Sequence, residues 1–292
     1  MKITNEHHLP KAFVNMANDQ REVVDGTYSV TELLKSTRQI LLTRRHHAEI
    51  TVDVADMIWM LFGTAVHHIL EQHVTGENEF AEERLYVEMG NGITLTGQID
   101  LYDIHKGLLE DWKTASVWKV IFGDYEDWQS QAEYYAYLLW RHGLPCTKAN
   151  FWAILKDHSK ADARRKGSEY PQLPVKRKTF EFNKDKDMVR IETEICHKLF
   201  ELSKAVDLPD EQLSMCTEKE RWNKGSKYAV IKNGRKTALR VLDSERAALD
   251  WAQANGGDYI EERLGEDKRC LEYCSCAEFC DYWIKNYKDK QN

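Results

Sequence analysis

The sequence predicts an α/β fold in which a central mixed β-sheet is flanked by helices. Residues 93–101 alternate apolar and polar side chains, a second short strand is predicted at 108–114, and a short connection from Asp103 to Gly107 separates them. Amphipathic helical patterns stand on either side of this pair, at 54–74 and at 124–142. Strands placed between helices in this order are typical of an α/β core.

The chain of 292 residues is long enough for one large domain, or for a domain with a smaller appendage. Its 42% hydrophobic and 30% charged residues are ordinary for a soluble globular protein. No apolar run approaches the roughly 20 residues of a membrane span, and the first residues lack an apolar segment of the signal-peptide type. We therefore expect a cytoplasmic protein without membrane contact.

Residues 1–28 contain few apolar side chains and are predicted to form an N-terminal arm with a short helix. Ser29 and Glu32 have capping-box spacing, which predicts a helix from 29 to about 46. Arginines and histidines make this helix locally basic, as either a solvated or a phosphate-contacting face. Asp53 or Asp56 is the expected cap of the next helix, at 54–74.

Residues 82–103 are predicted to form a hairpin with its turn at 90–92. The strand at 108–114 then folds back against the second hairpin strand, which is expected to bring Asp100 close to Asp111 and Lys113. Because side chains alternate along a strand, Asp111 and Lys113 project to one side and Trp112 to the other.

Two carboxylates at one strand edge raise each other's pKa, and a bound divalent cation is the usual reason for such a pair. Hard oxygen ligands suit Mg²⁺, which keeps several waters and is often shared with substrate phosphates. An ammonium group nearby would orient or polarise an attacking water. Taken alone, Asp-x-Lys is also the ordinary pattern of a solvated edge strand.

Four short motifs follow one another from Gly63 to Tyr135. They read Gly63-x-x-x-His67-x-x-x-Glu71, Gly97-x-x-Asp100, Asp111-x-Lys113 and Gln131-x-x-x-Tyr135. This ordered series resembles the RecB-type exonuclease branch of the PD-(D/E)XK nuclease superfamily, and the residues at 9–10 and 29–34 resemble its phage-encoded members. The resemblance implies a restriction-endonuclease-like core at 29–206.

The resemblance also implies roles for these residues. Asp100 and Asp111 would bind Mg²⁺ or Mn²⁺, aided by the backbone carbonyl of Trp112 and by His67. Lys113 would position the attacking water and stabilise the pentavalent transition state. The remaining motif residues are expected to support the ligands or to position DNA: Glu71, Gln131 and Tyr135. The neighbouring His68 does not match the motif spacing.

The stretch at 156–178 is rich in lysine and arginine, has two prolines and shows no periodicity. It is predicted to be a loop, either a DNA-contacting flap, which we favour, or a merely soluble connection. A strand at 150–155 precedes it, and a helix at 184–206 closes the first domain.

Residues 207–292 are predicted to form a small C-terminal subdomain. A hairpin spans 228–241, with Asn233-Gly234 as a type I′ turn. A helix at 243–256 and a short strand at 259–263 follow. The basic residues of the hairpin region are expected to form a phosphate-binding stripe: Lys224, Lys227, Lys232, Arg235, Lys236 and Arg240.

Four of the seven cysteines crowd into 270–280, and the odd total argues against a disulfide framework. Thiolates bind Zn²⁺ or an iron–sulfur cluster, each through four ligands. Cys270, Cys274 and Cys280 leave Cys216 or Cys276 as the fourth ligand, and we favour Cys216 because Cys274 and Cys276 are hard to fit into one site.

Several members of the resembled family carry a [4Fe–4S] cluster that clamps the end of the nuclease domain. Their first cysteine lies upstream of the histidine motif, whereas here no cysteine precedes Cys146. The resemblance slightly favours a [4Fe–4S] cluster over Zn²⁺ in a cysteine-clamped subdomain. Free thiols in a compact tail are the alternative.

We therefore expect a Mg²⁺- or Mn²⁺-dependent DNA nuclease, an exonuclease of phage recombination or replication in the host cytoplasm. A recombinase, a helicase or a single-strand-binding protein is an expected partner. A structure-specific endonuclease and a DNA-binding component of a recombination or defence complex stay open as alternatives. The net charge of −7 disfavours a nucleic-acid coat protein but suits a nuclease, whose metal ligands are acidic.

Overall fold

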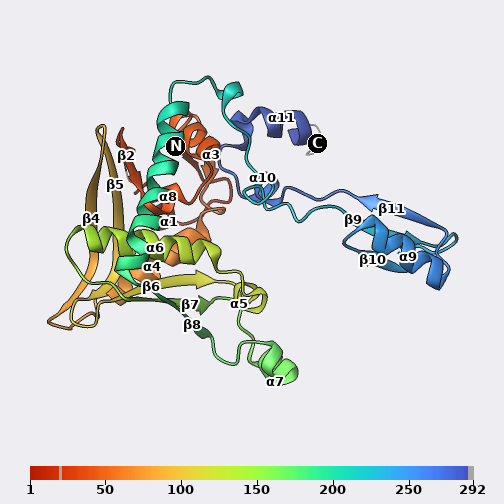
Figure 1. The fold of residues 1–292 in the computed structure, drawn as a ribbon, viewed down its shortest axis with the longest axis horizontal. Coiled ribbons are helices and arrows are strands. Elements are labelled where there is room, and N and C mark those ends of the chain that lie inside the picture. The colour runs from red at the N-terminus through yellow and green to blue at the C-terminus, as the bar shows by residue number, and fades with distance from the viewer. Residues whose placement is uncertain (20–21, 289–292) are drawn as a thin grey trace. The chain divides into compact units, whose positions relative to one another are not determined.

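The computed structural model describes residues 1–19 and 22–288 (Figure 1). The chain divides into two compact units. The first consists of Met1–Lys35 and His47–Asp207, and the second of Ser36–His46 and Leu208–Asn292. The second unit therefore includes a segment from early in the chain that we predicted as part of the core.

A six-stranded mixed sheet forms the centre of the first unit. The strand order is β2-β5-β6-β7-β8, and β4 pairs with β5 on the far side of this path. β2–β5 and β6–β7 are parallel, and β4–β5, β5–β6 and β7–β8 are antiparallel, which confirms the predicted mixed sheet. The strands are β2 (Thr27–Ser29), β4 (Glu79–Gly90), β5 (Ile93–Asp103), β6 (Leu108–Ala115), β7 (Lys148–Leu155) and β8 (Val175–Glu181).

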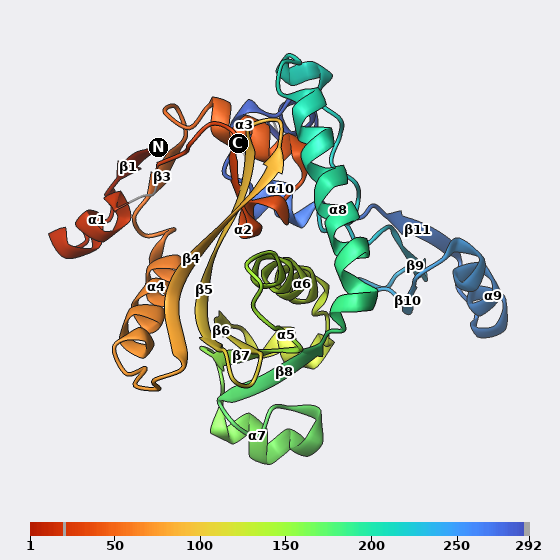
Figure 2. The same ribbon diagram turned by 60° about the vertical axis from the view of Figure 1, so that its left-hand side comes forward.

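Helices flank this sheet, as predicted. In Figure 2, strands β4 and β5 lie between α4 (Ile58–Glu71) and α6 (Glu126–Arg141). α8 (Lys184–Ala205) packs on α6. α6 approaches β5 closely at Gly97, where a Cβ atom would lie 2.7 Å from the side chains of Tyr135 and Leu138.

Shorter elements complete the first unit. β1 and β3 form a separate two-stranded parallel sheet, and α1 and α4 contribute to a small apolar cluster beside it. These elements are β1 (Lys2–Thr4), α1 (Lys11–Asn18), α2 (Val30–Leu33), β3 (Thr51–Asp53), α5 (Val117–Phe122), α7 (Lys160–Lys166) and η1 (Gly167–Glu169).

The predicted single helix from 29 to 46 is wrong. The Ser29–Glu32 capping box is present, but its helix, α2, ends at Leu33. Ser36 then caps a new helix, α3 (Thr37–Arg45), by accepting a hydrogen bond from the Gln39 N–H. A second capping residue a few positions after the first thus divides the predicted helix.

The predicted loop at 156–178 is also wrong in large part. Ser159 caps α7, and 175–181 form β8, which pairs with β7 at the edge of the sheet. An edge strand can expose charged side chains on both faces, so β8 lacks the apolar alternation of a half-buried strand. The expected cap at Asp53 or Asp56 is absent as well, because Met57 occupies the N-cap of α4.

The second unit contains a three-stranded antiparallel sheet of order β10-β9-β11. The turn at Asn233-Gly234 is not type I′, because only Gly234 has a positive φ (81°), and the Arg235 N–H donates to the Lys232 carbonyl. Its elements are α3, η2 (Asp210–Gln212), β9 (Lys227–Ile231), β10 (Arg240–Leu242), α9 (Glu245–Asn255), β11 (Tyr259–Arg263), α10 (Lys268–Glu272), η3 (Ala277–Phe279) and α11 (Asp281–Tyr287).

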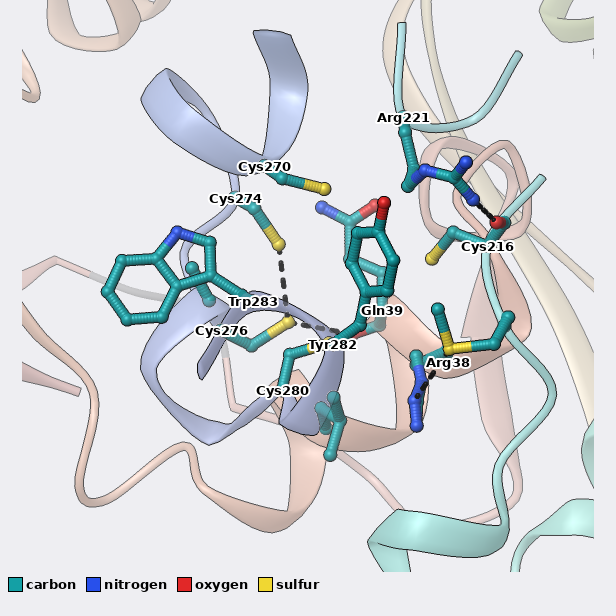
Figure 3. Close-up of a pocket in the computed structure, with 13 residues that line it drawn as sticks. Arg38, Gln39, Cys216, Arg221, Cys270, Cys274, Cys276, Cys280, Tyr282 and Trp283 are labelled. Atoms are coloured by element: carbon teal, nitrogen blue, oxygen red, sulfur yellow. Dashed lines mark hydrogen bonds between the residues drawn. The ribbon is translucent and has the colours of Figure 1, made fainter. Parts of the chain in front are cut away.

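α3 is bound to the C-terminal part of the second unit by buried charge. The Arg38 guanidinium is 2% exposed and donates two hydrogen bonds, of 2.9 and 2.7 Å, to Oδ1 of Asp281. Arg45 and His46 pair with Asp210. The same unit holds a cysteine-lined pocket (Figure 3). None of the described helices has the length and apolar character needed to cross a membrane.

Candidate active site

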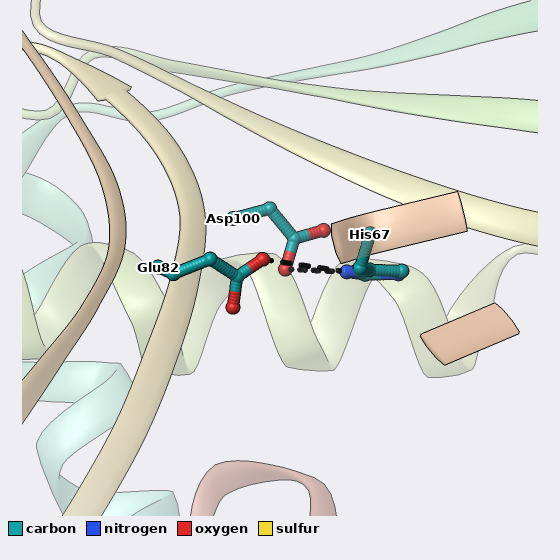
Figure 4. Close-up of side chains that lie close together, drawn as sticks. All are labelled: His67, Glu82 and Asp100. Atoms are coloured by element: carbon teal, nitrogen blue, oxygen red, sulfur yellow. Dashed lines mark ion pairs between the residues drawn. The ribbon is translucent and has the colours of Figure 1, made fainter. Parts of the chain in front are cut away.

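Three elements of the first unit bring an imidazole and two carboxylates together (Figure 4). The Nδ1 atom of His67, on α4, lies 3.3 Å from Oδ1 of Asp100 on β5 and 3.7 Å from Oε1 of Glu82 on β4. One ligand atom from each residue lies within 4.8 Å of the other two. Carboxylates with an imidazole can bind a hard divalent cation such as Mg²⁺ or Mn²⁺.

Asp100 is held at the point where β5 and β6 separate. The backbone pairing of β5 with β6 runs from Asp103–Leu108 to Leu101–Glu110. Beyond it, the Trp112 N–H donates a hydrogen bond of 2.7 Å to Oδ2 of Asp100. The carboxylate thus replaces a backbone acceptor and lies beside the strand that carries Asp111 and Lys113.

Asp111 is a buried carboxylate with a cationic neighbour. Its side chain is 1% exposed, and its Oδ2 lies 2.5 Å from the Lys113 ammonium. Burial raises the pKa of Asp111 to about 7, against the lowering effect of that ammonium. The Gln131 amide nitrogen lies 3.5 Å from Oδ1 of Asp111 and 3.2 Å from the Tyr135 hydroxyl. Burial and the Asp111 charge raise the pKa of Tyr135.

His67 compensates the two carboxylates that it contacts. Burial by itself lowers the pKa of an imidazole, but hydrogen bonding to Asp100 and Glu82 raises the pKa of His67 to about 10. The imidazolium therefore supplies positive charge between Asp100 and Glu82. A cation bound by these carboxylates would compete with the His67 proton.

The donor atoms fit a divalent cation on independent grounds. Oε1 of Glu82 is buried and has His67 Nδ1 only as a long contact at 3.7 Å, and Oδ2 of Asp111 has the Lys113 ion pair but no well-aligned hydrogen bond. A buried carboxylate oxygen without a donor is costly in free energy. A bound cation would satisfy such oxygens.

The motif spacing points to Glu71 as the glutamate near His67, but the structure places Glu82 there. Glu71 lies at the surface, with Oε2 3.6 Å from Nδ1 of His68, and is not brought to the His67–Asp100 pair. Glu82, which the sequence analysis missed, lies there instead. The pairs Ala81–Leu101 and Glu83–Ile99 place Glu82 opposite Asp100. Counting back from the turn at 91–92 without a bulge would have placed Glu83, also acidic, opposite Asp100, and the register shift between Glu88 and Gly90 places Glu82 there instead.

Five cysteines line the pocket of the second unit: Cys216, Cys270, Cys274, Cys276 and Cys280 (Figure 3). None of the seven cysteines, all of which lie in the described part of the chain, forms a disulfide. The Ser36 hydroxyl lies 3.1 Å from Sγ of Cys216, and Sγ of Cys276 lies 3.6 Å from that of Cys274. Burial raises the pKa of Cys270 to about 12. The Cys270 side chain is therefore a protonated thiol unless a metal displaces its proton.

The spacing of these sulfur atoms bears on the metal that they would suit. Zinc–sulfur bonds of about 2.3 Å place the four sulfurs of a tetrahedral site roughly 3.8 Å apart. Among the described residues, no three cysteines bring their sulfur atoms within 4.8 Å of one another. The thiols are therefore not gathered in the compact arrangement of a tetrahedral zinc site.

No protein-family model matches the chain, and no curated protein matches it. Its fold has a distant likeness to solved structures. One is SSO0001, at 15% identity over 65% of this chain and 83% of that chain, with a TM-score of 0.47. Another is the complex of LHK-Exo with dAMP, at 15% identity over 62% and 90%, with a TM-score of 0.40.

LHK-Exo is described as an alkaline exonuclease from Laribacter hongkongensis. A phage-related exonuclease from Haemophilus somnus is 12% identical over 62% of this chain and 75% of that chain, with a TM-score of 0.29. At these values the likeness carries no argument about activity. The function has to be inferred from the chain's own residues.

Proposed function

We propose that the chain is a Mg²⁺- or Mn²⁺-dependent deoxyribonuclease, acting as an exonuclease in phage recombination or replication. The observation that carries the proposal is the convergence of His67, Glu82 and Asp100 beside the Asp111–Lys113 pair. A hard-cation site next to a lysine matches the needs of phosphodiester hydrolysis, in which both the attacking water and the phosphate require activation.

The roles of the residues follow from their positions. Asp100, Asp111 and Glu82 would hold the cation with His67, and the Trp112 carbonyl is a further candidate ligand. When bound, the cation supplies Lewis-acid activation of the phosphate and of a water. The Lys113 ammonium positions the attacking water and neutralises charge that develops on the pentavalent phosphorus centre.

The motif residues around this centre have supporting roles in the proposal. Gln131 holds Asp111 through its amide, and Tyr135 holds Gln131 in turn. Glu71, which faces solvent one helical turn after His67, is assigned to DNA positioning. Removing Gln131 should therefore weaken metal binding, whereas removing Glu71 should weaken DNA binding.

The cysteine pocket supports a second metal group, a structural one. We assign Cys216, Cys270, Cys274 and Cys280 as the ligands of a [4Fe–4S] cluster, with Zn²⁺ as the alternative. The support for a metal group is that all four of these cysteines line one pocket. Four thiolates are the usual ligand set of such a cluster.

The test is a cleavage assay on linear duplex, covalently closed circular and single-stranded DNA, with Mg²⁺ or Mn²⁺ against EDTA. An exonuclease releases mononucleotides from linear DNA and leaves closed circles intact, whereas an endonuclease nicks the circles. The Asp111→Asn variant is the matched control, and its activity should fall by about a thousandfold. A protein that binds DNA but cuts none of the substrates would reject the proposal in favour of a DNA-binding component.

A further inference from the structure

Large aromatic rings are exposed around the carboxyl ends of β6 and β7. They form two pairs and are 41% to 68% exposed: Trp59 and Phe62 on α4, and Trp118 and Phe122 on α5. We call these four residues the aromatic platform. Clusters of exposed large apolar side chains mark binding surfaces in soluble proteins, and the metal centre makes no use of these rings.

The exposed rings are arranged so that a further planar ring can stack on them. The Trp118 and Phe122 rings are stacked, with centroids 5.5 Å apart and planes 26° apart. Trp59 and Phe62 make an edge contact at 6.4 Å. A stacked, solvent-exposed pair presents an open π-face, on which a planar nucleobase of any sequence can stack.

Lysines lie over the same rings. The Lys156 ammonium lies 4.1 Å from the centroid of Trp59, and the Lys166 ammonium 5.9 Å from that of Trp118. Lys176 lines a groove beside α5. Rings combined with cations match a polymer that alternates planar bases with anionic phosphates.

The platform is attached to the strand that carries the catalytic lysine. α4 approaches β6 closely at Gly63, where a Cβ atom would lie 3.3 Å from the Thr114 hydroxyl. The Lys156 N–H donates to the Ala115 carbonyl at 3.0 Å. Asp157 caps α5 by accepting hydrogen bonds from Ser116 and from the Val117 N–H. These contacts hold the platform rigidly beside the active-site strand.

We propose that the aromatic platform stacks the unpaired bases of a single-stranded DNA segment whose phosphates continue to the metal centre. Trp59 precedes His67 by two helical turns, about 12 Å along the axis, a distance that a few nucleotides span. Single-stranded DNA is the occupant because the bases of a duplex are already stacked on one another and cannot accept protein rings. The inference names the form of DNA that the proposed nuclease binds beside its metal centre, and it rests on that proposed function.

The test uses binding alone, with the wild-type protein in EDTA so that no DNA is cut. Fluorescence anisotropy compares oligothymidylate of about 20 nucleotides with an abasic strand of the same length and charge and with a blunt duplex. The platform predicts that oligothymidylate binds roughly 5- to 100-fold more tightly than the abasic strand. Trp118→Ala and Trp59→Ala should lose most of this preference while keeping their affinity for the abasic strand, and Trp118→Tyr should retain it.

Phe200→Ala is the matched control. Phe200 is 54% exposed on α8 and also has a lysine, Lys204, 4.3 Å from its ring centroid, but it lies outside the platform. Its removal should leave the preference for bases unchanged. Equal affinity of the wild type for the oligothymidylate and the abasic strand, or no binding of either, overturns the platform.

The outcomes for the platform and for the nuclease are distinguishable. Base-dependent binding by a protein that never cuts DNA supports the platform and rejects the nuclease. Active cleavage together with base-independent binding rejects the platform alone.

Discussion

The Trp112 N–H, two residues beyond Glu110 of the last β5–β6 pair, donates a hydrogen bond of 2.7 Å to the Asp100 carboxylate, one residue beyond Leu101 of the same pair. One oxygen of Asp100 therefore completes the sheet, and the other faces His67. Asp100 thus links the architecture of the sheet to the chemistry of the proposed metal centre.

Two substitutions separate these roles. Asp100→Asn keeps an oxygen that accepts from Trp112 but removes the charge, so cleavage should fall by about a hundredfold or more with little loss of stability. Asp100→Ala should lose as much activity and, in addition, about 1–3 kcal/mol of folding free energy from the unsatisfied N–H. Urea denaturation in EDTA measures the difference. Equal stability of the two variants would contradict the structural role of Asp100.

Glu82 offers a test that the sequence motifs alone do not suggest. Glu82→Gln should weaken Mn²⁺ binding and reduce cleavage by about tenfold or more, because it removes one of the three clustered ligands. Its neighbour Glu83 pairs with Ile99 in the strand register and is the matched control. Titration calorimetry with Mn²⁺ should show a weaker Glu82→Gln protein and an unchanged Glu83→Gln protein. Two equally weakened variants would remove Glu82 from the ligand set.

His67 and His68 are adjacent on α4 but contact different residues. His67 contacts Asp100 and Glu82, whereas His68 pairs with Glu71 at the surface. His67→Ala should therefore impair cleavage by about tenfold or more, and His68→Ala should change it little. Rates measured at saturating Mg²⁺ distinguish them. If both variants lose the same activity, the effect comes from packing of α4.

Stability without metal should fall as the pH rises. The pKa of His67 is raised from 6.5 to about 10, so its contribution is complete below pH 6.5 and is lost as the pH rises toward 10. The pKa of Asp111 is raised from 3.8 to about 7, so between those values the unfolded chain loses this proton before the folded one does, and the free energy of unfolding falls as the pH rises.

Calorimetric melting in EDTA from pH 6 to pH 9 should therefore show a falling Tm. Mn²⁺ should raise the Tm most at the alkaline end, where fewer protons compete for the ligands. A Tm in EDTA that does not change over this range would contradict the raised pKa of His67.

The cysteine pocket gives a prediction about composition. Anaerobically purified protein should contain iron and absorb broadly near 400 nm, or be colourless with stoichiometric zinc. Cys270→Ser should lose the metal and lower the Tm, because the binding free energy of a structural metal becomes folding free energy. Cys196, which is exposed on α8, supplies the control variant Cys196→Ser. Soluble protein with neither metal would reject the site.

Local patterns were enough to predict a mixed sheet with strands β4 to β7 and its flanking helices. Asp111 and Lys113 project together because strand alternation is a local rule. Glu82 was not predicted as a site residue because its partner depends on the register of the β4–β5 hairpin. A shift of one residue in this register moves every side chain to the opposite face of the sheet. β8 was predicted as loop because an edge strand exposes its charged residues and shows no apolar alternation.

No local sequence pattern indicates which chain segments make up the second unit. Arg38 and Asp281 are 243 positions apart, and nothing in the sequence around either residue names the other. The cluster at 270–280 signalled a thiol site, but the proximity of Ser36 to Cys216 became visible only in three dimensions.

The inclusion of α3 in the second unit has a consequence for synthesis on the ribosome. α3 emerges early, yet Arg38 and Leu42 on this helix line the cysteine pocket of a unit whose remainder begins at Leu208. The second unit therefore stays incomplete until the last part of the chain has been made. A chain truncated after Asp207 would leave Leu42 without the cysteine-bearing segments of this pocket, and a fragment that starts at Leu208 would lack Leu42 itself. No single cut point along the chain divides it into the two units.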